Sequence, residues 1–195
     1  MQALSCIELT QGDKNLLCDL VRQTLDLAIY QAHFKPLKTP VSKLLQQKAA
    51  TFVTLYSNDE LRGCIGTYCA DTALWKDVCD HTYSSACEDS RFLPLTEKEL
   101  KNVSFNISIL SELVELNNLG ETQLLQDLRI NIDGLMLQYK EKRAIFLPSV
   151  WQQLATEKEF VSALKRKGGW PTTYWSDELK IFTFQTLNIE ADYLE

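Results

Sequence analysis

The segment LRGCIGT, residues 61–67, has the length and composition of a β-strand but contains two of the seven glycines in the chain. Glycine weakens a strand unless another group must come close to the backbone. An ordinary core strand would carry valine, isoleucine or an aromatic residue at these places. The segment therefore predicts a strand whose surface is kept bare for another chain segment or for a ligand.

The residues around this segment predict a hairpin followed by two helices and a strand. Residues 50–56 have the pattern of a first strand, 57–60 that of a turn, and 61–68 that of the returning strand. A helix is predicted over 72–87 from a buried stripe at helical spacing. Thr96 and Glu99 have the spacing of a capping box and predict a second, short helix. Alternating apolar residues over 103–109 predict the strand that closes the unit.

The same order of elements returns in the second half of the chain. The patterns predict strands at 134–140 and 143–147, helices at 149–155 and 157–167, and a strand at 180–188. This repetition predicts an internal duplication, although the two halves are hardly alike in sequence. Segment 61–67 then corresponds to 143–149, where bulky side chains and a proline replace the glycines. The fold class expected is α+β, an antiparallel sheet with helices in two β-β-α-α-β repeats.

A long amphipathic helix is predicted ahead of the first repeat. Apolar residues recur near helical spacing over residues 13–34. Thr10, three residues before Asp13, is suited to cap its N-terminus. Pro36 and Pro40 follow, so the helix is expected to end before them.

Composition excludes several classes of protein. The 195 residues carry a net charge of -6, which argues against a general affinity for nucleic acid. The densest basic stretch, Lys165-Arg166-Lys167, is interpreted as the solvated end of a helix. No apolar run approaches the roughly 20 residues of a membrane span, and residues 1–10 lack the order of a signal peptide. We expect a cytoplasmic protein with no membrane or nucleic-acid partner.

Six cysteines raise the question of disulfides or zinc. No two of them form a C-x-x-C pair, and their spacing does not resemble that of a zinc ribbon or finger. They are interpreted as reduced thiols that pack as small apolar residues. The sequence predicts no metal site and no cofactor.

The motif itself resembles a known family. Residues 61–66 are similar to the signature hexapeptide of the AMMECR family, the protein-A component of the AmmeMemoRadiSam system. Residues 89–94 are similar to the family's D-P-R-F-x-P element, with Ser90 in place of the first proline. Other segments similar to the family follow in order: Glu99-Leu100, Ile107-Ser111, Asp133-Leu135, Leu147-Val150, Lys167-Pro171 and Trp175.

The resemblance implies an AMMECR-type fold over a single domain, 1–195. That domain would hold the N-terminal helix at 13–34, repeat one at about 50–110 and repeat two at about 130–190. The family context implies Memo-type and radical-SAM proteins as partners. It supplies no settled activity.

Cys64 is the candidate nucleophile. A reactive cysteine needs a nearby cation or a helix N-terminus, and Arg62 lies two residues away, on the same face of a regular strand. Neither His33 nor His81 belongs to a motif that would pair it with Cys64. An inert buried cysteine and a ligand-contacting cysteine remain open beside the catalytic interpretation.

Arg62 and Arg91, with Asp89 nearby, form a second candidate cluster. Guanidinium groups bind carboxylate or phosphate in bidentate fashion, and a bare strand lets a small anionic ligand approach. The structural alternative is that Arg91 pairs with Asp89 or Glu88 to fix the junction between helix and loop. The candidate ligand- or partner-binding residues are Leu61, Arg62, Gly63, Cys64, Ile65, Gly66, Thr67, Asp89, Arg91, Phe92 and Pro94.

Two classes of function stay open on the sequence. One is a binding or adaptor module that presents the bare strand to a small anion or a partner protein. The other is an enzyme that acts on a small anionic molecule with Cys64 or with the cluster of Arg62, Asp89 and Arg91.

Overall fold

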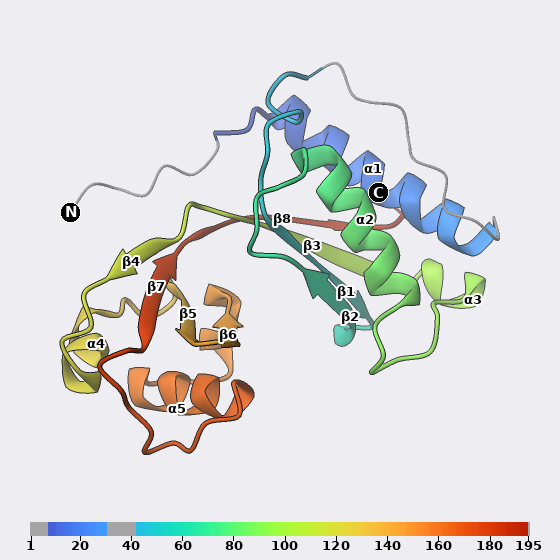
Figure 1. Ribbon diagram of the computed structural model, residues 1–195. Coiled ribbons are helices and arrows are strands. Elements are labelled where there is room, and N and C mark those ends of the chain that lie inside the picture. The colour runs from blue at the N-terminus through green and yellow to red at the C-terminus, as the bar shows by residue number, and fades with distance from the viewer. Residues whose placement is uncertain (1–7, 31–41, 195) are drawn as a thin grey trace. The chain divides into compact units, whose positions relative to one another are not determined.

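The chain divides into two compact units in the computed structural model, which describes residues 8–30 and 42–194. The first unit holds the described residues up to 110 together with 187–194, and the second unit holds 111–186. Figure 1 gives the elements of both. The single-domain organisation expected over 1–195 stays a prediction.

The first unit is a four-stranded antiparallel sheet with helices. Its strands stand in the order β2-β1-β3-β8, and α1 and α2 cover one face (Figure 1). The core between them includes Val53, Leu55 and Phe105, all nearly or fully buried. The elements are α1 (Gln11–Tyr30), β1 (Thr51–Ser57), β2 (Glu60–Gly66), α2 (Leu74–Cys87), α3 (Glu97–Leu100), β3 (Val103–Leu110) and β8 (Thr186–Asp192).

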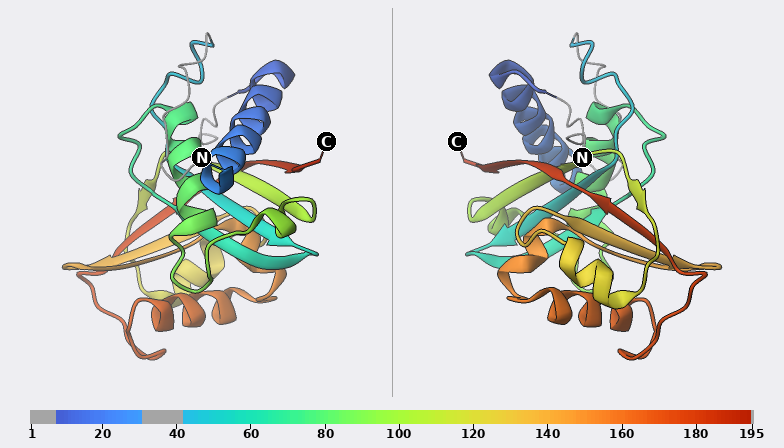
Figure 2. Two further views of the ribbon diagram at one scale, coloured as in Figure 1. Left: turned by 90° about the vertical axis from the view of Figure 1, so that its right-hand side faces the viewer. Right: turned by 90° about the vertical axis from the view of Figure 1, so that its left-hand side faces the viewer.

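The second unit is a sheet of the same size, with strand order β4-β7-β5-β6. Helix α5 lies along one face of this sheet (Figure 2). Trp151 stacks on Phe160 in its core, with ring centroids 3.8 Å apart. The elements are β4 (Val114–Leu116), α4 (Glu121–Asp127), β5 (Gly134–Tyr139), β6 (Lys142–Phe146), the 3₁₀ helix η1 (Pro148–Gln152), α5 (Glu157–Lys167) and β7 (Lys180–Phe184).

The predicted duplication is confirmed by the strand order. The triplets β2-β1-β3 and β6-β5-β7 have the same arrangement, so β2 and β6 are equivalent edge strands. A fourth strand lies beside β3 in the first sheet and beside β7 in the second. Strand β4 follows β3 in the chain but pairs with β7, and β8 follows β7 but extends the sheet beside β3.

This exchange of fourth strands corrects the prediction of one strand over 180–188. The Gln185 N–H donates to the Ser111 Oγ, and the Ser111 N–H donates to the Gln185 carbonyl oxygen. These bonds end β7 at Phe184, and β8 begins at Thr186. The patterns over 111–133 predict no element, yet β4 and α4 lie there.

Local capping and turn signals are confirmed. Asn58 and Asp59, with φ of 50° and 65°, form the two-residue turn between β1 and β2. Glu99 Oε2 accepts from the N–H of Thr96, 2.9 Å away, which begins α3. Helix α1 begins at Gln11, earlier than predicted, and residues 31–34 lie outside the described residues, as do Pro36 and Pro40.

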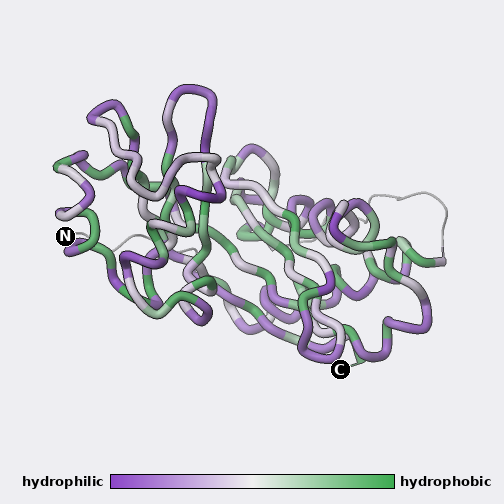
Figure 3. Tube along the Cα trace, turned by 90° about the horizontal axis from the view of Figure 1, so that it is seen from below, coloured by the Kyte–Doolittle hydropathy of each residue, from purple (hydrophilic) through white to green (hydrophobic). Residues whose placement is uncertain are grey.

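Figure 3 shows hydrophilic and hydrophobic residues interspersed along the chain. None of the helices in the described part of the chain is long and apolar enough to cross a membrane. The longest described helix, α1, buries only one stripe of side chains, as a helix on a sheet does.

Candidate functional site

The motif lies on β2, an edge strand that contains a β-bulge. Leu55 of β1 lies opposite Gly63, whereas the next residue, Tyr56, lies opposite Leu61. Arg62 therefore has no partner residue on β1 and is the extra residue of the bulge. A bulge redirects its side chain and interrupts the alternation of faces. The expectation that Arg62 and Cys64 share a strand face relied on that alternation, and the bulge removes its basis.

Both glycines of the motif face atoms of the protein itself. A Cβ added to Gly63 would lie 2.1 Å from the backbone oxygen of Ser85 on α2. A Cβ added to Gly66 would lie 2.3 Å from the ring of Phe52. The sequence predicts a strand kept bare either for another chain segment or for a ligand. At Gly63 and Gly66 the space is taken by other segments of the chain. The glycines let α2 and an aromatic ring approach the backbone.

Ser85 shows how close α2 comes to the hairpin. Its hydroxyl accepts from the Ile65 N–H at 2.9 Å and donates to the Val53 oxygen at 2.8 Å. A helix side chain thus bridges β1 and β2 where a ladder bond would otherwise run. Ser85 was not part of the predicted site, and Gly63 is the only sequence signal for this contact.

Arg62 is bound by internal acceptors. Its Nε donates to Glu99 Oε1 at 2.7 Å, and its Nη2 donates to the Leu93 carbonyl at 2.8 Å. The hydrogen bond from Arg62 lowers the pKa of Glu99 to about 2. The Nη1 of Arg62 is buried and has no acceptor among the described residues. The sequence predicts Glu99 as a capping residue and as part of a segment similar to the family; in the structure it caps α3 and also binds Arg62.

Asp89 and Arg91 hold the peptide of Cys64. Asp89 Oδ2 accepts from the Cys64 N–H at 2.9 Å, and Arg91 Nη2 donates to the Cys64 carbonyl at 3.2 Å. Arg91 also donates to both carboxylate oxygens of Asp89. These hydrogen bonds, led by those from Arg91, hold the pKa of Asp89 well below its usual range. The structural alternative, a pair between Arg91 and Asp89, is therefore found in the structure.

The next residues form a small exposed surface, here called the 91–94 surface: Arg91, Phe92, Leu93 and Pro94. The guanidinium carbons of Arg62 and Arg91 lie 5.7 and 5.5 Å from the centroid of the Phe92 ring. Leu93 is 83% exposed and the Arg91 side chain is 52% exposed. The backbone below is fixed by a bond from the Leu95 N–H to the Ala86 carbonyl, 2.7 Å. The loop is thus held on both sides while Leu93 faces solvent.

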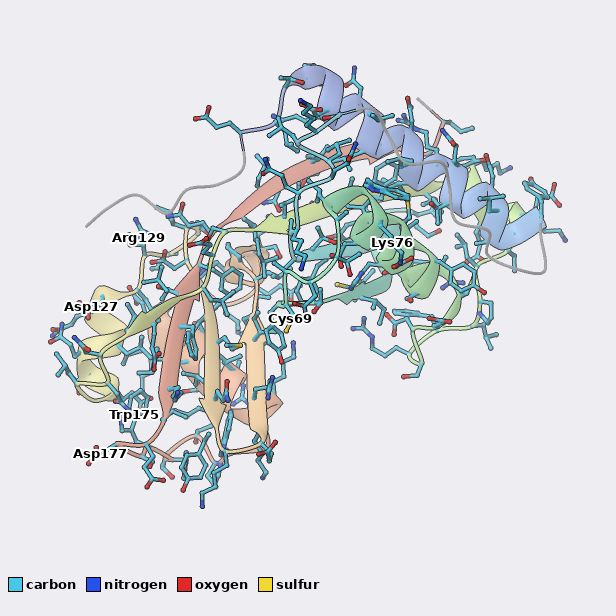
Figure 4. All side chains as sticks on the ribbon, turned by 45° about the horizontal axis from the view of Figure 1, so that its top comes forward. Cys69, Lys76, Asp127, Arg129, Trp175 and Asp177 are labelled. Atoms are coloured by element: carbon cyan, nitrogen blue, oxygen red, sulfur yellow. The ribbon has the colours of Figure 1, made fainter. Side chains whose placement is uncertain are left out.

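The hydrogen bond given to the Cys64 sulfur comes from a hydroxyl and not from these cations. The Cys64 Sγ accepts from the Thr54 hydroxyl, 3.3 Å away. His81 is bound within its own helix, with Nδ1 2.9 Å from the carbonyl oxygen of Asp77, and His33 lies outside the described residues. None of the cysteines in the described part of the chain takes part in a disulfide, and the exposed Cys69 is labelled in Figure 4.

The remaining predicted residues complete the β2 hairpin. Leu61 is 43% exposed. The Thr67 N–H donates to the carbonyl of Thr51 at 2.9 Å, and so extends the pairing one residue beyond β2. No group of three or more His, Cys, Asp or Glu side chains in the described part of the chain is placed to hold a metal.

One basic residue of the second unit differs from its prediction. Lys165 is 1% exposed, although Lys165-Arg166-Lys167 was interpreted as a solvated helix end. Its Nζ donates to Glu121 Oε1 at 2.7 Å and to the Thr172 carbonyl at 2.9 Å, and lies 5.2 Å from the Trp175 ring centroid. Figure 4 labels Trp175. Burial is tolerated because each side of the ammonium meets an acceptor or a ring face.

Comparison with known sequences decides the family. The AMMECR1 family profile matches residues 6–189. The chain belongs to the AMMECR1 family. An AMMECR1 relative, Protein MJ0810 of Methanocaldococcus jannaschii, is 32% identical over 149 residues, 73% of each chain. Protein NEQ441 of Nanoarchaeum equitans is 27% identical over 179 residues, 90% of this chain and 99% of its own length.

A solved structure extends the comparison to the fold. The crystal structure of the uncharacterized protein PH0010 from Pyrococcus horikoshii matches with a TM-score of 0.83 at 24% identity, and the match covers 91% of each chain. The resemblance drawn from residues 61–66 and 89–94 is thus confirmed for family and fold. AMMECR1 membership assigns no reaction to the site.

Proposed function

We propose that this chain is a binding module whose 91–94 surface docks a partner protein. The partner presents an apolar side chain to Leu93 and a carboxylate to Arg91. The AMMECR family context suggests Memo-type and radical-SAM proteins as these partners, in the cytoplasm. The observation that carries the proposal is an ordered loop with an 83% exposed leucine at its tip.

Rigidity supports this role. Docking a flexible loop costs conformational entropy, whereas a loop already fixed in its bound shape does not lose it again. The loop is tied to β2 by Arg91 and Asp89, to Arg62 by the Leu93 carbonyl, and to α2 by Leu95. Leu93 is thus presented on a framework that depends little on the partner.

The chemistry of the surface suggests what the partner brings. Arg91 donates through Nε and Nη2 to groups of its own chain, while Nη1 takes part in none of those bonds. Its half-exposed guanidinium can therefore donate to a further carboxylate. Leu93 and Phe92 supply apolar area beside it, the combination found at the centres of protein interfaces. A free small anion would use Arg91 but would gain nothing from Leu93.

The experiment measures binding by isothermal titration calorimetry. The full chain is titrated with purified Memo-type and radical-SAM proteins from the same organism. Leu93→Ala is expected to weaken binding about tenfold or more, as truncation of a buried interface residue does. Leu119→Ala is the matched control, because Leu119 is 74% exposed but belongs to the second unit. Equal affinity of Leu93→Ala and the unmodified chain would contradict the proposal.

The catalytic alternative makes a different prediction for Cys64. In the structure Arg62 donates to Glu99 and Leu93, not to the Cys64 sulfur. A binding module keeps its partner affinity in Cys64→Ser, which replaces the sulfur by oxygen and leaves the peptide held by Asp89 and Arg91 in place. Alkylation of Cys64 at a pH well below the pKa of a free cysteine thiol, together with loss of biological activity in Cys64→Ser, would favour the enzyme instead.

A further inference from the structure

A row of polar side chains crosses the first unit's sheet on the face away from α1 and α2. Thr54 on β1 lies opposite Cys64 on β2 and opposite Asn106 on β3. Asn106 Nδ2 donates to Glu190 Oε1 on β8, 3.1 Å away. Val53 and Leu55, on either side of Thr54, belong to the helix-covered core, so the row faces the other way. The row is Cys64, Thr54, Asn106 and Glu190, here called the polar row.

One acceptor in the polar row is unsatisfied. Asn106 is 8% exposed, and its Oδ1 is buried with no hydrogen-bond partner among the described residues. The amide cannot simply be turned over, because its nitrogen then could not donate to Glu190. A buried acceptor without a donor is destabilising. Asn106 Oδ1 can therefore accept from a donor that the described residues do not supply.

The rest of the row is also made of acceptors and sulfur. The Thr54 hydroxyl proton is used by Cys64 Sγ, 3.3 Å away, and Glu190 is a carboxylate whose residue is exposed. The two nearby arginines donate elsewhere: Arg62 to Glu99, and Arg91 to Asp89 and the Cys64 carbonyl. The side chains of the polar row therefore favour a hydrogen-bond donor with positive charge.

Two aromatic residues border the polar row. Phe52 and Tyr56 are two residues before and after Thr54 and so lie on its face of β1. The Phe52 ring covers Gly66, two residues after Cys64 on β2. Burial raises the pKa of Tyr56, and the charges of Cys64 and Glu190 raise it further. Aromatic rings attract cations.

We propose that the polar row is a binding site for a small molecule with a cationic nitrogen group, an ammonium or a guanidinium. The cation donates to Asn106 Oδ1 and to the Glu190 carboxylate, beside the sulfur of Cys64 and between Phe52 and Tyr56. This ligand class is opposite in charge to the small anion expected from Arg62 and Arg91. The site does not use the 91–94 surface, so a test of cation binding is independent of a test of partner docking.

The first test compares thiol reagents of opposite charge on the full chain. Cys64 is reacted with 2-aminoethyl methanethiosulfonate, a cation, and with 2-sulfonatoethyl methanethiosulfonate, an anion, and each site is followed by peptide mass spectrometry. Cys69, which is exposed, is the internal reference. The ratio of cation to anion rate is expected to be about tenfold greater at Cys64 than at Cys69, as local potential concentrates ions of one sign.

Two variants assign that ratio to the row. Glu190→Gln removes the charge but keeps a carbonyl that accepts from Asn106 Nδ2, and it is expected to lower the Cys64 ratio severalfold. Glu115→Gln removes an exposed carboxylate from β4 in the second unit and leaves the ratio unchanged. A Cys64 ratio equal to or below that of Cys69, or a Cys64 that neither reagent modifies while Cys69 reacts, overturns the proposal.

The second test measures binding without the sulfur. Methylguanidine is titrated into ¹⁵N-labelled protein, and the side-chain amide of Asn106, assigned from its loss in Asn106→Asp, is followed by NMR. Saturable shifts of this signal by methylguanidine, several times larger than those caused by acetate, are expected. Larger shifts with acetate, or no shift of Asn106 with methylguanidine, contradict the assignment.

Discussion

Replacing Gly63 by alanine tests whether the glycines of the motif make room for the protein or for a ligand. Alanine in place of glycine within a strand ordinarily stabilises a protein, by about 0.5–1 kcal/mol. At Gly63 the new Cβ would lie 2.1 Å from the Ser85 carbonyl oxygen, where ordinary contact begins near 3.4 Å. Strand and helix must therefore separate by roughly 1 Å, and the sign of the effect reverses.

The magnitude follows from the contacts that this separation disturbs. Overpacking of a well-packed site costs about 1–3 kcal/mol. The Ser85 hydroxyl would also lose its bonds to the Ile65 N–H and the Val53 carbonyl, each contributing about 1 kcal/mol. After subtracting the backbone benefit of alanine, Gly63→Ala is expected to lower the free energy of unfolding of the first unit by about 3 kcal/mol.

The assay is urea unfolding combined with hydrogen exchange read by mass spectrometry. Exchange reports peptides of β1 and α2 separately from those of the second unit, which matters because the chain has two compact units. Gly12→Ala is the matched control. Its Cβ would meet only Thr10 Oγ1, at 3.7 Å, so alanine there should stabilise α1 by up to about 1 kcal/mol.

Two outcomes for Gly63→Ala would contradict this account of the glycine. If Gly63→Ala unfolds within about 0.5 kcal/mol of the unmodified chain, and exchange at Ser85 and Ile65 is unchanged, α2 does not press on the strand as described. A stable Gly63→Ala that had lost only ligand or partner binding would instead mean that the glycine serves a ligand.

Three further outcomes are expected. Glu99→Gln removes the charge that pairs with Arg62. Because the folded pKa of Glu99, about 2, lies below its ordinary 4.5, the pair stabilises fully above that ordinary value and its contribution is lost as pH falls toward 2. The variant should be less stable by about 1 kcal/mol at pH 7, with the difference vanishing near pH 2 in urea titrations. In native protein at pH 8, iodoacetamide should label the exposed Cys69 and spare Cys79, whose pKa burial raises to about 11; equal labelling would contradict this. Lys165→Met should destabilise the second unit by about 2 kcal/mol, measured by urea unfolding, and an unchanged midpoint would mean that its buried contacts do not matter.

Much of the fold follows from local patterns in the sequence. The hairpin turn at Asn58 and Asp59 and the capping box at Thr96 depend on neighbouring residues, so local chemistry specifies them. The break between β7 and β8 does not follow from local sequence patterns. It depends on the pairing of Gln185 with Ser111, a contact between distant segments that leaves no mark in the alternation over 180–188.

The candidate site also has parts that the sequence predicts and parts that it does not. The glycines and the element at 89–94 locate it in the sequence, and the structure brings Arg62, Asp89, Arg91 and Phe92 together. Their partners were not predictable, because the bulge at Arg62 is set by the register with β1. The polar residues of β3 are visible as an alternation, but which residue of β1 faces Asn106 is a property of the folded sheet.

The exchanged fourth strands bear on how the chain is made. During synthesis the first repeat emerges early, but β8, which covers the open edge of β3, leaves the ribosome only after the strands of the second unit. Until then an eight-residue, largely apolar strand has an unpaired edge, where other nascent chains can attach. Folding domain by domain from the N-terminus, the usual route for chains of two parts, cannot finish here. The sheet of the first unit waits for β8, so termination of synthesis before Thr186 should leave the edge of β3 unpaired.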